Sequence, residues 1–272
     1  MQNNRLFLTL AIIVAVGFGA AFAYNAYLHI GYLLDARAAR EDAATIQDIF
    51  AEAIELIHPE PIELPRPPEP MQPVNPPELP EHAKPFIAAI LEARKLTGND
   101  DIIAYIHIEG TNVSYVVVHC IDNEFYLHRD IHRQHSAHGS LFLDYLNSPG
   151  FTDRSSIIYG HNMRDGTMFH NLRYFVRPDY FDAHRYIAVF TKTEMLTYQI
   201  FSVFATRIDF EYIQVYFYDD NDFLSLVSEL KRRSVHDAGI TIGADDRILI
   251  LSTCTNTDPD VRLVVAGVLI TE

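Results

Sequence analysis

The chain has 272 residues, of which 49% are apolar and 21% charged, and its formal net charge is −15. This is the composition of a globular protein with one good-sized core, and it lacks the clustered Lys and Arg that binding to nucleic acid requires. We therefore expect no nucleic-acid partner. The two cysteines, Cys120 and Cys254, allow one bridge at most, which excludes a disulfide scaffold.

The N-terminus carries an apolar run, Leu6–Tyr24, that contains no charged residue. The run is close to the length that a helix needs to cross a membrane. A cleaved signal peptide is the alternative, with "AFA" at 21–23 as its cleavage site. Because the run is longer than a usual signal sequence, we interpret residues 1–28 as an uncleaved membrane anchor.

Two segments of opposite character follow the anchor. Residues 29–58 place apolar side chains at helical spacing, which predicts a juxtamembrane helix. The stretch 59–85 holds eleven of the 14 prolines, which excludes helix and favours an extended polyproline conformation of about 80 Å. We interpret 59–84 as a semi-rigid spacer in front of a domain at 85–272.

The domain is predicted to be mainly β. A helix is expected at Phe86–Leu96, and helical segments interrupt the later chain at 166–175 and at 220–234, where Asp220 or Asn221 would cap the helix. Eight short strand-like runs with turn residues between them predict a closed or nearly closed barrel. The expected strands are Ile102–Ile108, Val113–His119, Ser140–Asp144, Ser156–Tyr159, Tyr186–Thr191, Met195–Thr206, Arg247–Thr253 and Val261–Ile270.

Cys254 stands at the end of one of these runs, and a lone cysteine is more often a core residue than a nucleophile. A hairpin over 255–261 would place Arg262 opposite Cys254 on the same face. A fixed positive charge beside a thiol favours the thiolate and can stabilise an oxyanion. Pairing of the arginine with Asp258 or Asp260 is the equally available alternative.

His161 follows an apolar strand and a glycine, so it would project from a strand end. Together with the cysteine segment, its surroundings resemble the active-site signatures of the class B sortases. "YGHNM", "DG" and "MF" surround the histidine, and "LSTC" followed by "RLVVAG" contains Cys254 and Arg262. The similarity extends over most of 85–270, including "GTNVSYVVVHCIDNEFYL" and "GSLFLD". The resemblance implies an eight-stranded sortase-type β-barrel with a helix inserted before the cysteine strand.

The resemblance also implies a cysteine transpeptidase, with Cys254 as the nucleophile, His161 as the general acid and base, and Arg262 stabilising the tetrahedral intermediate. The residues around the cysteine are expected to contact the substrate. They are Ser252, which shares the face of Cys254, and Thr253 and Thr255. No cofactor and no metal ion is expected.

The implied substrates are surface proteins with a C-terminal sorting signal of the N-P-x-T-x type. Cleavage would leave a thioacyl-enzyme, and an amine of a cell-wall peptide would release the product. A pilin-polymerising sortase, which uses a pilin amine, is the alternative. With the anchor, the chain is expected to be a single-pass protein of a Gram-positive cell membrane with its catalytic domain outside.

Some features depart from the family pattern or favour other functions. The segment "AYIHIEG" (104–110) lacks the Gly-Trp pair common in the family, and Cys120 is either inert or part of a regulatory bridge. A papain-like protease is excluded because the histidine precedes the cysteine by 93 residues and the C-G-S-C-W signature is absent. A non-enzymatic metal- or haem-binding surface domain is a further alternative. It would use four clustered histidines, His128, His132, His135 and His138, which otherwise lie in a loop joining two strands.

Overall fold

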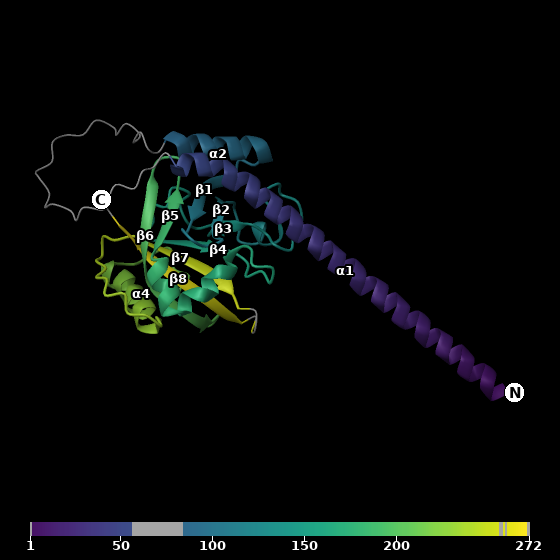
Figure 1. Ribbon diagram of the computed structural model, residues 1–272. Coiled ribbons are helices and arrows are strands. Elements are labelled where there is room, and N and C mark those ends of the chain that lie inside the picture. The colour runs from purple at the N-terminus through teal and green to yellow at the C-terminus, as the bar shows by residue number, and fades with distance from the viewer. Residues whose placement is uncertain (1, 56–83, 256–257, 259, 271–272) are drawn as a thin grey trace, which may run out of the picture.

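The computed structural model describes residues 2–55, 84–255, 258 and 260–270, except for the side chains of 2–19, 52, 55 and 84. Within these residues eight strands close into one barrel, and a long helix, α1 (Gln2–Glu55), crosses the barrel and extends away from it (Figure 1). The predicted mainly β barrel is therefore confirmed. The strands are β1 (Ile102–His107), β2 (Ser114–Val118), β3 (Leu141–Leu143), β4 (Ser155–Tyr159), β5 (Tyr186–Phe190), β6 (Met195–Arg207), β7 (Ile248–Cys254) and β8 (Val261–Leu269).

The strand order around the barrel is β1-β2-β3-β4-β7-β8-β6-β5. The pairs β2–β3 and β4–β7 run parallel, and the other neighbours run antiparallel. Parallel neighbours cannot be joined by a hairpin, so a long connection separates β4 from β7 in the sequence. It contains β5, β6 and the helices η3 (Phe169–Val176), α3 (Pro178–Ala183) and α4 (Asp220–Arg233). Two segments far apart in the chain thus lie side by side in the barrel.

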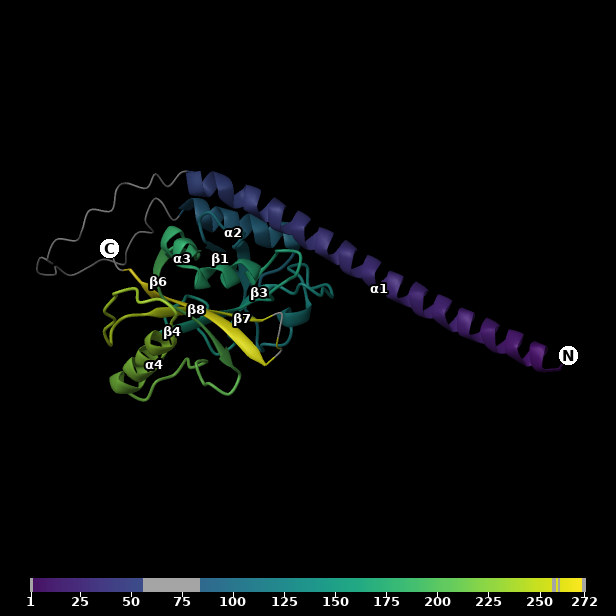
Figure 2. The ribbon, with the colours of Figure 1, turned by 60° about the horizontal axis from the view of Figure 1, so that its bottom comes forward.

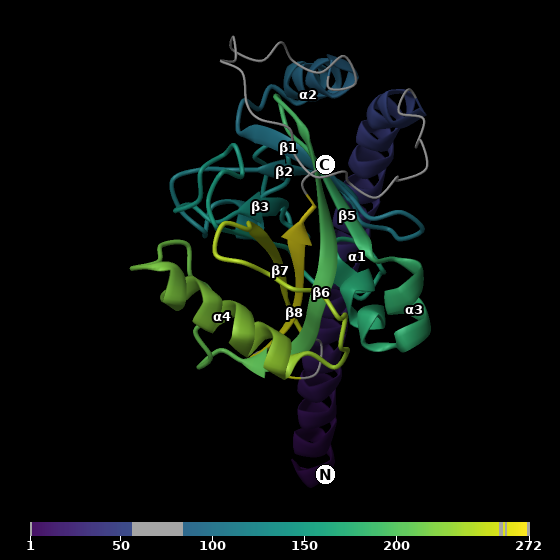
Figure 3. The same cartoon turned by 90° about the vertical axis from the view of Figure 1, so that its left-hand side faces the viewer.

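Strand β7 is buried on both faces, which explains the unbroken apolar run of its first four residues, 248–251. Leu249 and Leu251 belong to the core inside the barrel, whereas Ile248 and Ile250 pack with α4 on the outside. Figure 3 shows α4 alongside the late strands of the barrel. Because side chains alternate along a strand, Cys254 lies on the outer face.

Helices α1 and α2 (Lys84–Thr97) cover the outside of β1 and β2 (Figures 1 and 2). Phe50 of α1 is fully buried and stacks on Tyr105 of β1, with ring centroids 3.8 Å apart, and Phe86 stacks on Phe190 at 3.9 Å. The sequence assigned an anchor to 1–28 and a juxtamembrane helix to 29–58. In the structure residues 2–55 form one uninterrupted helix, because no proline breaks the segment.

None of the helices in the described part of the chain combines the length and the apolar side chains of a membrane span. The apolar run at 6–24, expected to be an anchor, falls mostly where side chains are outside the described residues. The expected spacer at 59–84 also lies outside them, apart from Lys84 at the start of α2.

The helical segment expected at 166–175 is the 3-10 helix η3, and α3 follows it as a second helix that the sequence did not predict. Arg177 has an extended backbone (φ −86°, ψ 129°), which ends η3. Pro178 then begins α3, at the position of a helix where the missing N–H costs nothing.

Helix α4 confirms the helix expected at 220–234, but its cap differs. The N-cap is Asp219, whose carboxylate accepts a hydrogen bond from the Asp222 N–H at 2.9 Å. Asp220 and Asn221, the predicted caps, lie inside the helix instead.

We expect Asp219→Ala to lower the free energy of unfolding by about 1 kcal/mol, because the first turn of α4 loses an acceptor for a backbone N–H. Asn221→Ala is the control, because Asn221 is an exposed residue in the first turn of α4. It should cost less than about 0.5 kcal/mol. Urea denaturation measures both. A larger loss in Asn221→Ala than in Asp219→Ala would contradict the capping role.

Candidate active site

Cys254 ends β7 and lies directly opposite Arg262 in the antiparallel β7–β8 pair. The Thr255 N–H donates to the Val261 carbonyl oxygen at 3.0 Å, which continues this pairing into the turn. Both Cys254 and Arg262 are half-buried. The predicted pairing of Cys254 with Arg262 is therefore confirmed, and the strand next to the cysteine carries an arginine opposite it.

Asp258 and Asp260, the alternative partners considered for Arg262, have another cation nearby. Arg207, at the end of β6, lies 3.5 Å from the Asp258 carboxylate and 3.6 Å from the Asp260 carboxylate. These acidic residues of the turn are thus paired with a cation on the strand that borders β8.

Strand β4 brings His161 to the other side of the cysteine. Every residue of β4 pairs with the β7 residue 93 positions later, and the Gly160 N–H donates to the Ser252 carbonyl oxygen at 3.2 Å. The same register leads to His161 and Cys254. In addition, Asn162 Nδ2 donates to the Cys254 carbonyl oxygen at 3.1 Å. Because β7 lies between β4 and β8, the histidine and the arginine flank the cysteine from opposite sides.

The His161 ring is held by a backbone carbonyl. Its Nε2 lies 2.8 Å from the Leu127 carbonyl oxygen, and since a carbonyl can only accept, Nε2 carries the hydrogen. The neutral ring therefore has its basic lone pair on Nδ1. Burial lowers the pKa of His161, an effect that His128 and His138 reinforce and that the bond to Leu127 opposes.

Gly160 is required by close packing. A Cβ atom at this position would lie 2.2 Å from Leu141 Cδ2 and 2.8 Å from a ring carbon of Phe169, so any side chain would displace a neighbour. The glycine lets the end of β4 pass close to the core. A larger residue here would shift the backbone that carries His161.

The segment 161–169, called the His161 loop below, returns on itself. The Phe169 N–H donates to the His161 carbonyl oxygen at 2.9 Å, and Asn162 forms a bridge with Met168. Met168 has φ 56°, a strained conformation for a residue with a side chain. The Tyr115 hydroxyl accepts a hydrogen bond from the Met168 N–H at 3.0 Å and holds it there.

A cavity of about 710 Å³ opens beside Arg262 and is lined by Asp222 and most of the segment 208–214. Tyr212 is buried in its wall with its hydroxyl 2.7 Å from Ser252 Oγ, and burial raises the pKa of Tyr212. The segment 208–214 belongs to no strand or helix and was not predicted from the sequence as part of the site. The only signal was the alternation of Ile208, Phe210 and Tyr212.

The three residues expected to contact substrate have different positions. Ser252 is on the outer face with Cys254 and bonds Tyr212. Thr253 is buried on the opposite face, and its Oγ1 has no hydrogen-bond partner among the described residues. Thr255 Oγ1 donates to the Asp258 carbonyl oxygen at 2.9 Å and so closes the turn after Cys254.

The chain is similar to known proteins over most of its length. The profile of the sortase domain matches residues 106–270. Sortase B of Listeria monocytogenes is 35% identical over 64% of this chain and 72% of its own length, and sortase B of Staphylococcus aureus is 31% identical over 70% and 77%. A solved Staphylococcus aureus sortase B–substrate complex superposes with a TM-score of 0.72 at 25% identity, covering 88% of this chain and 99% of that one. The chain belongs to the class B sortases.

The expected sortase-type barrel, with an N-terminal helix and a helix before the cysteine strand, is thereby confirmed. As a sortase the protein is a cell-surface cysteine transpeptidase that sorts proteins to the cell wall.

The second cysteine of this sortase is remote from the first. Cys120 follows β2, and its thiol donates to the Asp122 carbonyl oxygen at 3.2 Å. Burial raises the pKa of Cys120, which keeps it a thiol. Neither cysteine forms a disulfide in this structure, and a regulatory bridge of Cys120 stays a prediction.

The four clustered histidines do not share a helix. They lie in η2 (Tyr126–His128) and in the loop that joins it to β3. His132 contacts Asp42 of α1 at 3.2 Å, and His138 is fully buried beside Asp165. Among the described residues, no three His, Cys, Asp or Glu side chains are grouped to hold a metal ion. The segment is a loop that joins two strands, which was the alternative to a metal site in the sequence.

Burial of His161 predicts a pH effect. Its native pKa lies below the ordinary value of about 6.5, so as the pH falls the unfolded state binds a proton before the native state does. The stabilisation by the neutral ring is present above about pH 6.5 and is lost as the pH falls through the native pKa. An NMR titration of the His161 ring, assigned with His161→Gln, should give a midpoint below 6.5. A midpoint at or above that value would contradict the effect of burial.

Proposed function

We propose that this sortase cleaves an N-P-x-T-x-like sorting signal through a thioacyl intermediate on Cys254 and transfers the protein to a cell-wall peptide amine. The observation that carries the proposal is the arrangement of three strand ends. Cys254 on β7 has Arg262 opposite it on β8 and His161 alongside it from β4. A nucleophile, a group that moves protons and a fixed cation are the parts that acyl transfer requires.

In the acylation step, the Cys254 thiol gives its proton to His161 Nδ1, and the thiolate attacks the carbonyl carbon of the scissile peptide bond. The carbonyl oxygen becomes an oxyanion, which the Arg262 guanidinium stabilises. The carbon–nitrogen bond then breaks, and Nδ1 returns the proton to the leaving amine. Since Nε2–H is held by Leu127, Nδ1 is the only ring nitrogen available for both transfers.

In the second step, an incoming amine attacks the thioester while His161 Nδ1 accepts its proton. The tetrahedral intermediate expels the Cys254 thiolate, which takes the proton back from the ring. If water replaces the amine, the same steps hydrolyse the thioester, and the enzyme acts as a cysteine endopeptidase. A cell-wall amine or a pilin amine would serve equally in this chemistry.

The cavity beside Arg262 is the proposed seat of the sorting signal. Its wall combines apolar side chains, Ile208 and Phe210, with the polar ends of Tyr212 and Gln214. Such a lining can bury an extended peptide and orient its amides. Ser252 contributes through its bond to Tyr212, and Thr255 contributes by shaping the turn beyond the thiol. The sortase B–substrate complex, which superposes over most of this chain, supports a peptide substrate.

For the cellular setting, we propose that residues 1–28 anchor the enzyme in the membrane with residues 85–272 outside. Helix α1 continues to Glu55 and contacts the rest of the domain from Asp35 onward. From Tyr24 to Asp35 such a helix rises about 16 Å. The helix itself, rather than the proline-rich 59–84, would then set the distance between membrane and barrel.

The first test is the nucleophile. Cys254→Ala should abolish both cleavage and transfer with an unchanged melting temperature, because a half-buried residue at a strand end contributes little packing. Cys120→Ser is the control and should keep near-normal turnover. A library of sorting peptides, offered with cell-wall and pilin-type amines and analysed by mass spectrometry, gives the cleaved bond and the preferred amine. Substantial turnover by Cys254→Ala would exclude the assignment.

The second test separates catalysis from scaffold at Arg262. Arg262→Ala should slow single-turnover acylation by about a hundredfold, the effect of losing one oxyanion donor. Arg262→Lys should recover part of the rate, since it keeps the charge without the planar fork. Arg207→Ala removes the cation on β6 that pairs with this turn, and it should cost at most about 1 kcal/mol of stability with little change in rate. Near-normal acylation by Arg262→Ala would leave the arginine a structural residue.

A further inference from the structure

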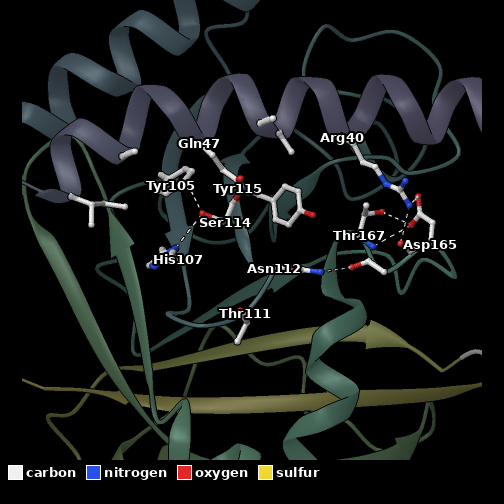
Figure 4. Close-up of a pocket in the computed structure, with 15 residues that line it drawn as sticks. Arg40, Gln47, Tyr105, His107, Thr111, Asn112, Ser114, Tyr115, Asp165 and Thr167 are labelled. Carbon is white, nitrogen blue, oxygen red and sulfur yellow. Dashed lines mark hydrogen bonds and ion pairs between the residues drawn. The ribbon is translucent and has the colours of Figure 1, made fainter.

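Helix α1 reaches the loop that carries the candidate acid–base histidine. Arg40 Nη2 donates to the Asp165 carbonyl oxygen at 2.9 Å and lies 3.4 Å from its carboxylate (Figure 4). Asp165 is near the tip of the His161 loop, and its side chain is 11% exposed. The next residue is held as well, since Asn112 Nδ2 donates to the Gly166 carbonyl oxygen at 3.3 Å. The tip of the loop is thus fixed from α1 and from the barrel.

The same part of α1 holds a second loop, residues 128–140, called the histidine-rich loop below. The Asp35 carboxylate accepts a hydrogen bond from the Ala137 N–H and lies 3.6 Å from His138 Nδ1. Tyr32 stacks on the His138 ring, with centroids 5.7 Å apart. The other ring nitrogen, Nε2, lies 3.1 Å from the Asp165 carboxylate. His138 is fully buried, and through these contacts it links the histidine-rich loop to both α1 and the His161 loop.

Both loops converge on His161. The His161 loop carries the residue itself and is closed by the hydrogen bond between Phe169 and His161. The histidine-rich loop adjoins η2, whose Leu127 carbonyl accepts the His161 Nε2 hydrogen. Gly139 lies so close to η2 that a Cβ atom there would be 2.6 Å from the Leu127 oxygen. Any shift of this loop therefore reaches the carbonyl that orients the ring.

The contacts of α1 with the barrel divide into two ends. At one end Ile46, Phe50 and Ala53 are buried, and at the other lie Asp35 and Arg40. A cavity of about 650 Å³ lies under α1 alongside residues 40–54, and polar groups such as Gln47, His107 and Ser114 line it (Figure 4). The apolar end buries its side chains against β1 and β2. The ion pairs and hydrogen bonds of Asp35, Arg40 and Asp42 instead go to the two loops.

We propose that α1 positions His161, through Arg40 on the His161 loop and Asp35 on the histidine-rich loop. Neither residue touches the reacting atoms, so both are positioning residues and not catalytic ones. The inference rests on the proposed role of His161 as acid and base. It makes the helix that leads toward the proposed anchor a part of the support of the active site.

The test compares Arg40→Ala with Arg37→Ala in the full chain, purified in detergent. Arg37 is a matched control, because it is on the same helix and its ion pair is with Glu41 of α1 itself. Removing Arg40 should lower kcat about tenfold with KM within about twofold, since small displacements of a catalytic group cost rate more than binding. The melting temperature should change by less than about 3 °C, because Arg40 is an exposed ion-pair partner. Arg40→Lys should recover part of kcat, and Arg37→Ala should match the wild type.

A second readout does not depend on turnover. With ¹⁵N-labelled histidine, the wild-type His161 ring should show the Nε2–H tautomer, and in Arg40→Ala its signals should move toward the average of the two tautomers. Unchanged signals, or a kcat loss that only follows the unfolded fraction, would overturn the positioning role. A wild-type chain that neither cleaves nor transfers peptides would refute the proposed function instead, and the NMR comparison would still decide the inference.

Discussion

The parallel pairing of β4 with β7 is the interaction on which the candidate site depends. It places His161 beside Cys254 although 93 residues separate them, and it makes β7 a central strand with Arg262 on its other side. Parallel pairing requires a long crossover, and here that crossover supplies α4 and the segment 208–214 that lines the cavity. The strand order therefore builds both the candidate active site and the wall of the cavity beside Arg262. A barrel in which β4 and β7 were not neighbours would have the same residues and no site.

The three candidate catalytic side chains differ in what holds them. Cys254 and Arg262 are fixed by the β7–β8 ladder, whose geometry the barrel determines. His161 lies just past the end of β4, so its ring depends on the Leu127 carbonyl and on a loop with strained backbone at Met168. Rigid strands thus present Cys254 and Arg262, whereas loop contacts orient His161. This difference explains why the contacts from α1 converge on the histidine.

Burial on both faces of the late strands has a second consequence. The inner residues of β7 fill the barrel, and the outer ones pack on α4 until Ser252, where the helix no longer covers the strand and Tyr212 takes its place. Cys254, the candidate nucleophile, is the next outward residue. Thr253 points the other way and is buried, so adjacency in the sequence did not make it a neighbour of the groove. The pleat of the strand decides which residues near Cys254 can reach a peptide.

The sequence by itself determined the eight strands, α4, the motifs around His161 and Cys254, and the pairing of Cys254 with Arg262. These features are local, since strand alternation, turn residues and a hairpin act over a few residues. Only the tertiary structure decided what non-local contacts control. Through such contacts Asp258 and Asp260 pair with Arg207, and α1 docks on the barrel as one helix. They also make the Leu127 carbonyl the hydrogen-bond acceptor of His161. The partner of a buried polar group depends on which distant segment packs against it. Local sequence patterns do not reveal which segments pack together.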